Sequence, residues 1–263
     1  MNNSILNEIC MVKRLEISKQ KETMPLNGLK ESIKRESRKK ISFKQALADS
    51  KTGIIAEFKR RSPSKGWINR KADAGKIASD YEAAGAAAVS CLTDGSFFGG
   101  YFEDFSRVRA NIKNIPLLRK DFIIDEYQIY HSKAIGADVI LLIAACISPA
   151  ETANFIEIAH GLDMEVLLEI HREEELSHIH PDTDTVGINN RSLNTFKTDI
   201  NHAEKLSSSI PGNYLKISES GLSNPETVIK LRKTGFQGFL IGENFMKTAS
   251  PGDTLREFIK KII

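Results

Sequence analysis

The sequence of 263 residues has few cysteines, no long hydrophobic run and almost balanced charge. The three cysteines, Cys10, Cys91 and Cys146, lie far apart and form no Cys-x-x-Cys pair, which excludes a disulfide framework and a thiolate zinc site. The longest apolar run, Val139–Ile147, has nine residues, about half of what a membrane-spanning helix needs. No apolar stretch ending in small residues opens the chain, so no secretory signal is predicted. These absences predict a cytoplasmic protein with no membrane partner.

Basic residues are concentrated near the start of the chain. Residues 1–50 hold 11 lysines and arginines against 6 acidic residues, whereas the net charge of the whole chain is only +3. The basic run Lys34–Lys40 has no interleaved aromatic residues, unlike many segments that bind nucleic acid. We interpret it as a solvated helix face and expect no nucleic-acid partner.

From residue 54 onward, short apolar runs alternate with segments of helical periodicity. The apolar runs predict strands at Ile54–Phe58, Ala87–Leu92, Pro116–Leu118, Val139–Ala144, Glu165–Ile170, Thr185–Asn189, Tyr214–Ser218 and Gly238–Ile241. Apolar spacings of three and four residues predict helices at Ala72–Ala84, Asp125–Ile135, Pro149–Ala159, Pro225–Lys233 and Thr254–Ile262. Strands that alternate with helices through short links predict a parallel sheet.

Eight strand–helix units in about 210 residues favour an α/β fold of the closed (β/α)8 type, a TIM barrel, over an open doubly wound sheet. No Gly-x-Gly-x-x-Gly follows the first strand, which argues against a dinucleotide-binding fold. Ile5–Ile17 and Leu29–Arg38 are predicted to be helical, and no low-complexity linker follows them. We therefore expect residues 1–50 to form an N-terminal helical extension packed on the barrel of residues 51–263, in one domain overall.

Charged side chains are predicted at the carboxyl ends of the strands, where a barrel interior is normally apolar. Three are basic and three are acidic: Lys59, Lys120 and Arg191, and Glu57, Glu169 and Glu219. Barrel enzymes carry their active sites at this end, so we interpret the group as a catalytic site. The alternative is a neutral network of ion pairs that closes the mouth of the barrel.

Two glycine turns follow the last two predicted strands. Ser220-Gly221 comes after the seventh strand and Gly242-Glu243 after the eighth. Barrels often bind phosphate there, through backbone N–H groups and the N-terminus of a short helix. The position of these turns favours a phosphorylated small-molecule substrate, although the glycines alone would also permit tight turns.

The histidines do not predict a metal site. His178 and His180 form a His-x-His pair, but no third ligand is predicted beside them, and catalytic zinc needs three protein ligands. His171 follows Glu169 closely and is expected to be a solvated side chain.

Two stretches, IAEFKRRSPSKG (Ile55–Gly66) and PLLRKDFI (Pro116–Ile123), resemble highly specific motifs of the indole-3-glycerol phosphate synthase family, barrel enzymes of tryptophan biosynthesis. Further stretches match the family in order: ILNEICMVKRLEI (Ile5–Ile17), SCLTDGSFFGG (Ser90–Gly100), GADVILLIAA (Gly136–Ala145), EVLLEIH (Glu165–His171), GINNRSL (Gly187–Leu193), ISESGL (Ile217–Leu222) and LIGENFM (Leu240–Met246). The resemblance therefore covers nearly the whole chain.

The resemblance implies a carboxy-lyase that converts 1-(2-carboxyphenylamino)-1-deoxyribulose 5-phosphate into indole-3-glycerol phosphate, with release of carbon dioxide and water. It implies a monomer that needs no cofactor and no metal. Lys120 corresponds to the general acid of ring closure, and Lys59 to a residue that binds substrate and serves as an acid later. Glu169 corresponds to the carboxylate that stabilises positive charge or takes part in dehydration. The supporting catalytic positions are Glu57, Asn189 and Ser220.

Binding roles follow from the same resemblance. Arg191 and Lys59 would hold the anthranilate carboxylate, which suits the fork of a guanidinium group, and Phe98 would form a wall for the aromatic ring. The residues that shape the pocket are Ser62 and Glu219, and the phosphate positions are Ser220, Gly221, Gly242 and Glu243. We expect the Glu243 carboxylate to turn away from the phosphate, and the N-terminal helix to cover the mouth of the barrel. We also expect a neighbouring cation to lower the pKa of each catalytic lysine.

Other functions remain open at this point. A Schiff-base aldolase barrel would use Lys120 as a nucleophile, and borohydride trapping would reveal it. Phosphoribosylanthranilate isomerase fits poorly, because its acid–base pair is Cys and Asp at the ends of the first and sixth strands. A barrel that has lost its activity and serves only for binding is the non-enzyme alternative.

Overall fold

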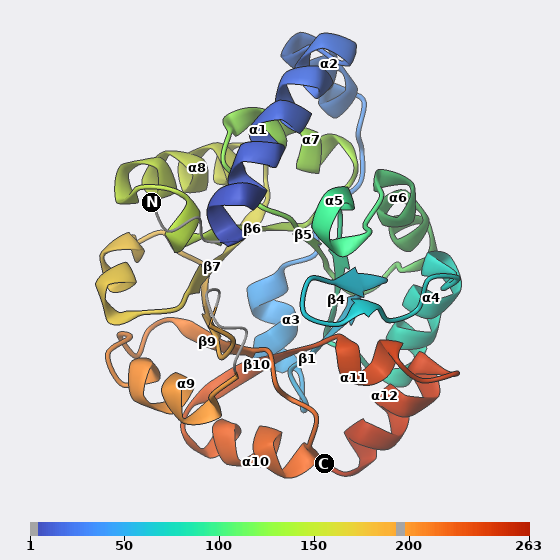
Figure 1. Ribbon diagram of the computed structural model, residues 1–263, viewed down its shortest axis with the longest axis vertical. Coiled ribbons are helices and arrows are strands. Elements are labelled where there is room, and N and C mark those ends of the chain that lie inside the picture. Colours follow the sequence, from blue (N-terminus) through green and yellow to red (C-terminus); the bar gives the residue numbers. More distant parts are fainter. Residues whose placement is uncertain (1–4, 193–197) are drawn as a thin grey trace.

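The computed structural model describes residues 5–192 and 198–263, and its centre is a closed barrel of eight parallel strands (Figure 1). The barrel strands are β1 (Ile54–Phe58), β4 (Ala88–Leu92), β5 (Leu117–Lys120), β6 (Val139–Ile143), β7 (Glu165–Ile170), β8 (Thr185–Asn189), β9 (Leu215–Glu219) and β10 (Phe236–Ile241). Each barrel strand pairs with the next one along the chain, and β10 pairs with β1 to close the ring. The predicted (β/α)8 TIM barrel is confirmed.

Helices surround the ring of strands (Figure 1). The larger ones are α4 (Ala74–Ala84), α6 (Phe102–Asn111), α7 (Glu126–Ala134), α8 (Pro149–Gly161), α9 (Ile200–Ser207), α10 (Pro225–Lys233) and α12 (Pro251–Lys260). Shorter elements lie in the connections: the hairpin β2 (Arg61–Ser62) and β3 (Gly66–Trp67), α5 (Gly95–Phe98), η1 (Ala144–Cys146), η2 (Glu173–His178) and α11 (Glu243–Met246). No helix in the described part of the chain is long and apolar enough to cross a membrane.

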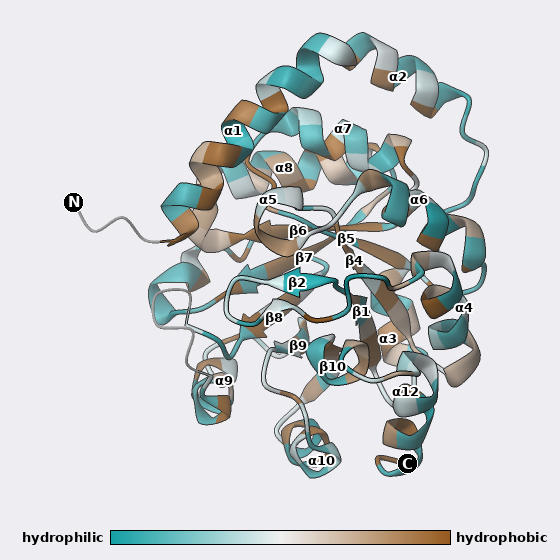
Figure 2. Cartoon of the chain, turned by 45° about the vertical axis from the view of Figure 1, so that its right-hand side comes forward, coloured by the Kyte–Doolittle hydropathy of each residue, from teal (hydrophilic) through white to brown (hydrophobic). Residues whose placement is uncertain are grey.

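Inward and outward side chains alternate along the barrel strands, as the two-residue repeat of a strand requires. Inward residues such as Ile55 and Leu118 belong to one core cluster, and outward residues such as Leu117 belong to the layer beneath the helices. Figure 2 shows the resulting hydrophobic centre and the more polar outer faces of the helices. Glu57 and Lys120 continue the inward rows at the carboxyl ends of their strands, so the fold directs both side chains into the barrel mouth.

The N-terminal extension contacts the barrel at both ends. It contains α1 (Ile5–Thr23), α2 (Leu26–Lys34) and α3 (Phe43–Asp49). Leu6 and Ile9 of α1 join the inner core at the mouth, and α2 packs against α7. Phe43 and Leu47 of α3 are buried in the same inner cluster, and the backbone N–H of Lys44 donates to Glu165 at the start of β7. Helix α3 therefore closes the end opposite the mouth.

The predicted helix Leu29–Arg38 is wrong at both ends, because α2 begins earlier and ends at Lys34. The following segment is held instead by the buried carboxylate of Asp138, at the start of β6. Arg38 Nη1 lies 2.6 Å from Asp138 Oδ1, and the backbone N–H of Ile41 donates to the same oxygen at 3.1 Å. These contacts stop the helix and lead the chain toward α3.

Candidate active site

A cavity of about 600 Å³ lies at the carboxyl ends of the barrel strands. Ile5, Leu6 and Ile9 of α1 form part of its lining, so the expectation that the N-terminal helix covers the mouth is confirmed. The predicted site residues all line this cavity: Glu57, Lys59, Ser62, Phe98, Lys120, Glu169, Asn189, Arg191, Glu219, Ser220, Gly221, Gly242 and Glu243. The structure thus brings together side chains from most of the barrel strands, which are far apart in the sequence.

Lys120 lies between two carboxylates at the centre of the cavity. Its Nζ atom is 2.9 Å from Glu169 Oε2 and 3.4 Å from Glu219 Oε2. Burial alone would lower the pKa of Lys120, but Glu169, Glu219 and Glu57 together raise it well above its ordinary value. The expectation of a lowered pKa is therefore wrong for this lysine. Lys120 is therefore a cation at neutral pH.

Glu169 is a buried but ionised carboxylate. Its Oε1 atom accepts a hydrogen bond from Asn189 Nδ2 at 3.0 Å. Burial would raise the pKa of Glu169, but Lys120, with His171 and the Asn189 hydrogen bond, lowers it to about 2. His171 is buried rather than solvated as expected, and its Nε2 atom lies 3.3 Å from Glu169 Oε1. Sequence reasoning missed this packing because His171 is the first residue after the strand.

Glu219 is a third buried carboxyl group, and it differs from Glu169 in protonation. Burial and the nearby Glu169 and Glu57 carboxylates raise the pKa of Glu219 to about 8, although Lys120 opposes them. A glycine on the neighbouring strand makes room for the side chain, since a Cβ atom at Gly187 would lie 2.4 Å from Glu219 Oε1. The site therefore holds a protonated acid beside a cation and a carboxylate.

A second ion pair and an arginine lie on other sides of the cavity. Lys59 Nζ is 2.5 Å from Glu57 Oε1. The backbone N–H of Arg191 donates to Asn189 Oδ1 at 3.0 Å, and its Nη1 atom donates to Ser64 Oγ at 3.0 Å. The guanidinium group is thereby fixed at the rim, where it can bind an anionic substrate group.

The two glycine turns follow β9 and β10 at the mouth of the barrel. Ser220 and Gly221 both have positive φ angles, 67° and 76°. Gly242 lies against Glu57, since a Cβ atom there would be 2.3 Å from Glu57 Oε1. The Glu243 carboxylate lies at the rim, 3.9 Å from Lys65 Nζ and 4.0 Å from an Arg191 nitrogen.

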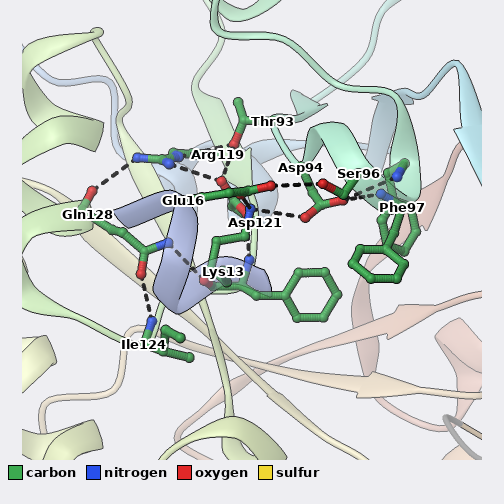
Figure 3. Close-up of polar contacts among 12 residues, drawn as sticks. Lys13, Glu16, Thr93, Asp94, Ser96, Phe97, Arg119, Asp121, Ile124 and Gln128 are labelled. Carbon is green, nitrogen blue, oxygen red and sulfur yellow. Dashed lines mark hydrogen bonds and ion pairs between the residues drawn. The ribbon is translucent and has the colours of Figure 1, made fainter. Parts of the chain in front are cut away.

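A buried charged cluster behind Lys120 was not predicted. It joins Lys13 of α1 to Asp94, Arg119 and Asp121 (Figure 3). Two signals are present in the sequence. Lys13 interrupts an apolar helix face between Ile9 and Ile17, and three consecutive charged residues follow the third predicted strand. Gly187–Leu193 is one of the stretches that resemble the family. Its last residue, Leu193, lies outside the described residues.

The barrel and the ionisable groups at its mouth are typical of a TIM-barrel enzyme, and such groups suit proton transfer. Comparison with known sequences narrows this class. A sequence model described as indole-3-glycerol phosphate synthase matches residues 6–258. The chain belongs to the indole-3-glycerol phosphate synthase family.

Curated relatives support this assignment over their full length. The chain is 51% identical over 258 residues to indole-3-glycerol phosphate synthase of Bacteroides thetaiotaomicron, and the match covers 98% of both chains. It is 42% identical over 262 residues to that of Caldanaerobacter subterraneus subsp. tengcongensis, again with 98% of both chains covered.

Solved structures share the fold at low sequence identity. Thiamine phosphate pyrophosphorylase from Pyrococcus furiosus superimposes with a TM-score of 0.62 at 14% identity, covering 84% of this chain and 98% of that one. Tryptophan synthase subunit alpha from Legionella pneumophila gives a TM-score of 0.60 at 11% identity, covering 84% and 96%. These two similarities concern the barrel fold alone.

Proposed function

We propose that this chain converts 1-(2-carboxyphenylamino)-1-deoxyribulose 5-phosphate into indole-3-glycerol phosphate, with release of carbon dioxide and water, in tryptophan biosynthesis. Membership of the family supports the reaction, and one observation carries its assignment to this site. That observation is the Lys120 ammonium group held between Glu169 and Glu219 inside a cavity. Ring closure needs a proton donor in such a position.

Each step of the reaction has a suitable group in the cavity. In ring closure, an aromatic carbon attacks the ketone carbon, and Lys120 protonates the ketone oxygen, which becomes a hydroxyl group. Loss of the carboxylate as carbon dioxide returns its bonding electrons to the ring. Dehydration then needs an acid for the departing hydroxyl, a role for Lys59, and a base for a proton of the methylene carbon beside the anilino nitrogen, so that the double bond of the indole ring forms and its N–H is kept. Glu169 is ionised at neutral pH, so it can take that proton or stabilise the preceding positive charge.

The remaining residues would bind and enclose the substrate. Arg191 and Lys59 hold the anthranilate carboxylate, and Phe98 contacts the aromatic ring. The phosphate group binds to backbone N–H groups at the two glycine turns, formed by Ser220, Gly221, Gly242 and Glu243. Glu57, Asn189 and Ser62 support these groups from the walls. Helix α1 limits access of water, because its apolar residues line the cavity.

The enzyme would act as a monomer in the cytoplasm. Its three cysteines are free, which is typical of a reducing compartment. The barrel and its extension supply every site residue named above from one chain. Sedimentation equilibrium at micromolar concentration should give the mass of a single chain, and a dimer mass would contradict the monomer.

Indole fluorescence during incubation with the carboxyphenylamino-deoxyribulose phosphate tests the proposed reaction. The unaltered chain should generate the signal, and Lys120→Met should abolish it nearly completely, since a positioned general acid contributes about 100- to 10,000-fold. Lys76→Met, on the exposed surface of α4, is the matched control and should retain the activity. A well-folded unaltered chain without product would refute the function. Full activity in Lys120→Met would show that another residue is the general acid, and Lys59 would be the next candidate.

Borohydride trapping distinguishes the proposed reaction from the alternative of a Schiff-base aldolase. A lysine nucleophile must lose its proton before attack, whereas the acidic groups around Lys120, the ionised Glu169 first among them, hold it protonated. Borohydride treatment in the presence of substrate should therefore leave no covalent adduct on Lys120. A trapped adduct would favour the aldolase.

A further inference from the structure

We propose that Lys13, on the N-terminal helix α1, is a positioning residue for Lys120, the proposed general acid. It acts through Asp121, which follows Lys120 directly, and through Asp94, which supports the cavity wall at Phe98. The effect on catalysis rests on the function proposed above, whereas the contacts that carry the argument are independent of it.

Lys13 is a buried cation surrounded by carboxylates. Only 3% of the residue is exposed, and its Nζ atom lies 3.0 Å from Asp121 Oδ1 and 2.9 Å from Asp94 Oδ2. The third partner is Glu16 on the same helix, at 2.7 Å. Figure 3 shows Lys13 reaching from α1 toward these groups. Lys13 Nζ donates a hydrogen bond to Glu16 and forms ion pairs with the two aspartates.

Asp121 connects this cation to the strand that carries Lys120. Its Oδ2 atom lies 2.9 Å from Arg119 Nη2 and accepts a hydrogen bond from Thr93 Oγ1 at 2.6 Å. Arg119 is 1% exposed and points to the outside of the barrel, where its other donors meet Gln128 and Ser132 of α7. The residues on both sides of Lys120 are therefore fixed by buried charge contacts outside the strand.

This arrangement determines where Lys120 points. Neighbouring side chains on a strand face opposite sides, so fixing Arg119 on the outer face directs Lys120 into the barrel. Lys13 compensates the charge of Asp121 from the mouth, while Arg119 compensates it from the helix layer. The extension thus contributes one of the two cations that hold the end of β5 in place.

Asp94 connects Lys13 to a second wall of the cavity. Its Oδ1 atom caps α5 by accepting hydrogen bonds from the backbone N–H groups of Phe97 at 2.8 Å and Phe98 at 3.2 Å. Its Oδ2 atom binds Lys13, so one carboxylate joins the docked helix α1 to the aromatic wall at Phe98.

Loss of the Lys13 cation would leave two buried aspartates with too little positive charge. Burial alone would lower the pKa of Lys13, but Asp121, Asp94 and Glu16 raise it above its ordinary value, so the group stays charged in the working pH range. A buried carboxylate that loses its partner must bind a proton, take up water or move. Each response shifts the end of β5, and a displacement of about 1 Å at a catalytic group can cost about 100-fold in rate.

Steady-state kinetics of Lys13→Met, with Lys19→Met as the matched control, test the proposal. Both lysines lie on α1, but Lys19 is exposed. Lys13→Met should lower kcat by about 10- to 100-fold, because the change displaces a reacting group, while KM should rise by a smaller factor through the wall at Phe98. Lys13→Arg, which keeps the charge, should recover part of kcat, and Lys19→Met should match the unaltered chain. Unchanged kcat in Lys13→Met, or a rise in KM alone, would overturn the proposal.

A second variant separates positioning from simple stabilisation. Lys13→Met combined with Asp94→Asn removes one cation and one carboxylate, so it should recover the free energy of unfolding while kcat stays low. Recovery of both quantities would show that Lys13 serves stability alone and would overturn the proposal.

Hydrogen exchange gives a readout that needs no substrate. The backbone amides of Phe98 and Phe122, which donate to Asp94 and Asp121, should exchange faster in Lys13→Met than in Lys19→Met. Unchanged exchange at both amides would overturn the proposal. Faster exchange in a protein that never converts the substrate would refute the proposed function and leave this coupling in place.

Discussion

Glu219 holds a proton inside the barrel, so this group should contribute to the pH dependence of the stability of the protein. Burial and the neighbouring carboxylates raise the pKa of Glu219 from an ordinary value of 4.5 to about 8. Between these values the folded chain keeps a proton that the unfolded chain has lost, so the free energy of unfolding falls as the pH rises. Each pH unit is worth about 1.4 kcal/mol, which gives a loss of about 3 kcal/mol between pH 5 and pH 7.5.

Glu219→Gln removes this titration and preserves the size of the side chain. Urea unfolding followed by circular dichroism at pH 5, 6 and 7.5 should show that the unaltered chain loses about 3 kcal/mol more than the variant over this range. Glu243→Gln is the control, because it removes a partly exposed carboxylate from the same cavity, and it should keep the original dependence. Parallel curves for Glu219→Gln and the unaltered chain would refute a protonated Glu219.

Two further predictions concern the phosphate turn and the cysteines. Gly242→Ala should lower kcat/KM by about 100-fold with little loss of stability, because the new Cβ atom would displace Glu57. Steady-state kinetics measure this effect, and an unchanged kcat/KM would contradict the prediction. Cys10 should be the first thiol alkylated by iodoacetamide, with a half-maximal rate near pH 7, since a hydrogen bond from Cys146 lowers the pKa of Cys10 to about 7. Cys91 should stay unlabelled in the folded chain because it is fully buried, and mass spectrometry that finds it labelled before Cys10 would contradict the assignment.

The strands of the barrel could be predicted because most are short apolar runs, but β5 shows the limit of that rule. Its predicted range, Pro116–Leu118, stops before the charged residues, whereas the strand continues to Lys120. Arg119 remains in the strand because Thr93, Asp121 and α7 satisfy its donors in a buried place. No local pattern shows partners that lie in other elements.

Tertiary contacts likewise determine the shape of the extension. A helical pattern alone continues through Arg38, but the carboxylate of Asp138 binds this arginine and ends the regular structure earlier. Helix α3 was not predicted, since its few apolar residues gain their stability from the base of the barrel rather than from a long amphipathic face.

The location of the site followed from the sequence, whereas its electrostatics did not. Charged residues at the carboxyl ends of parallel strands must meet at one mouth, and the structure places the predicted residues around one cavity. The pKa of Lys120 depends on which groups lie nearest, and the acidic side chains of Glu169, Glu219 and Glu57 raise it against the effect of burial. Sequence spacing contains no such distances. For the same reason it could not show that Glu169 and Glu219 carry different protonation states.

The closed base of the barrel has a consequence for the entry of substrate and the release of products. Helix α3 and the apolar side chains above it fill the end opposite the mouth, so the cavity is a blind pocket. In the described part of the chain, residues of α1 line the cavity on the side of the mouth, so carbon dioxide, water and the phosphorylated product would leave from the side at which the substrate enters. A bulky product that stays bound therefore blocks the next substrate. Accumulated product would therefore inhibit the enzyme in competition with its substrate.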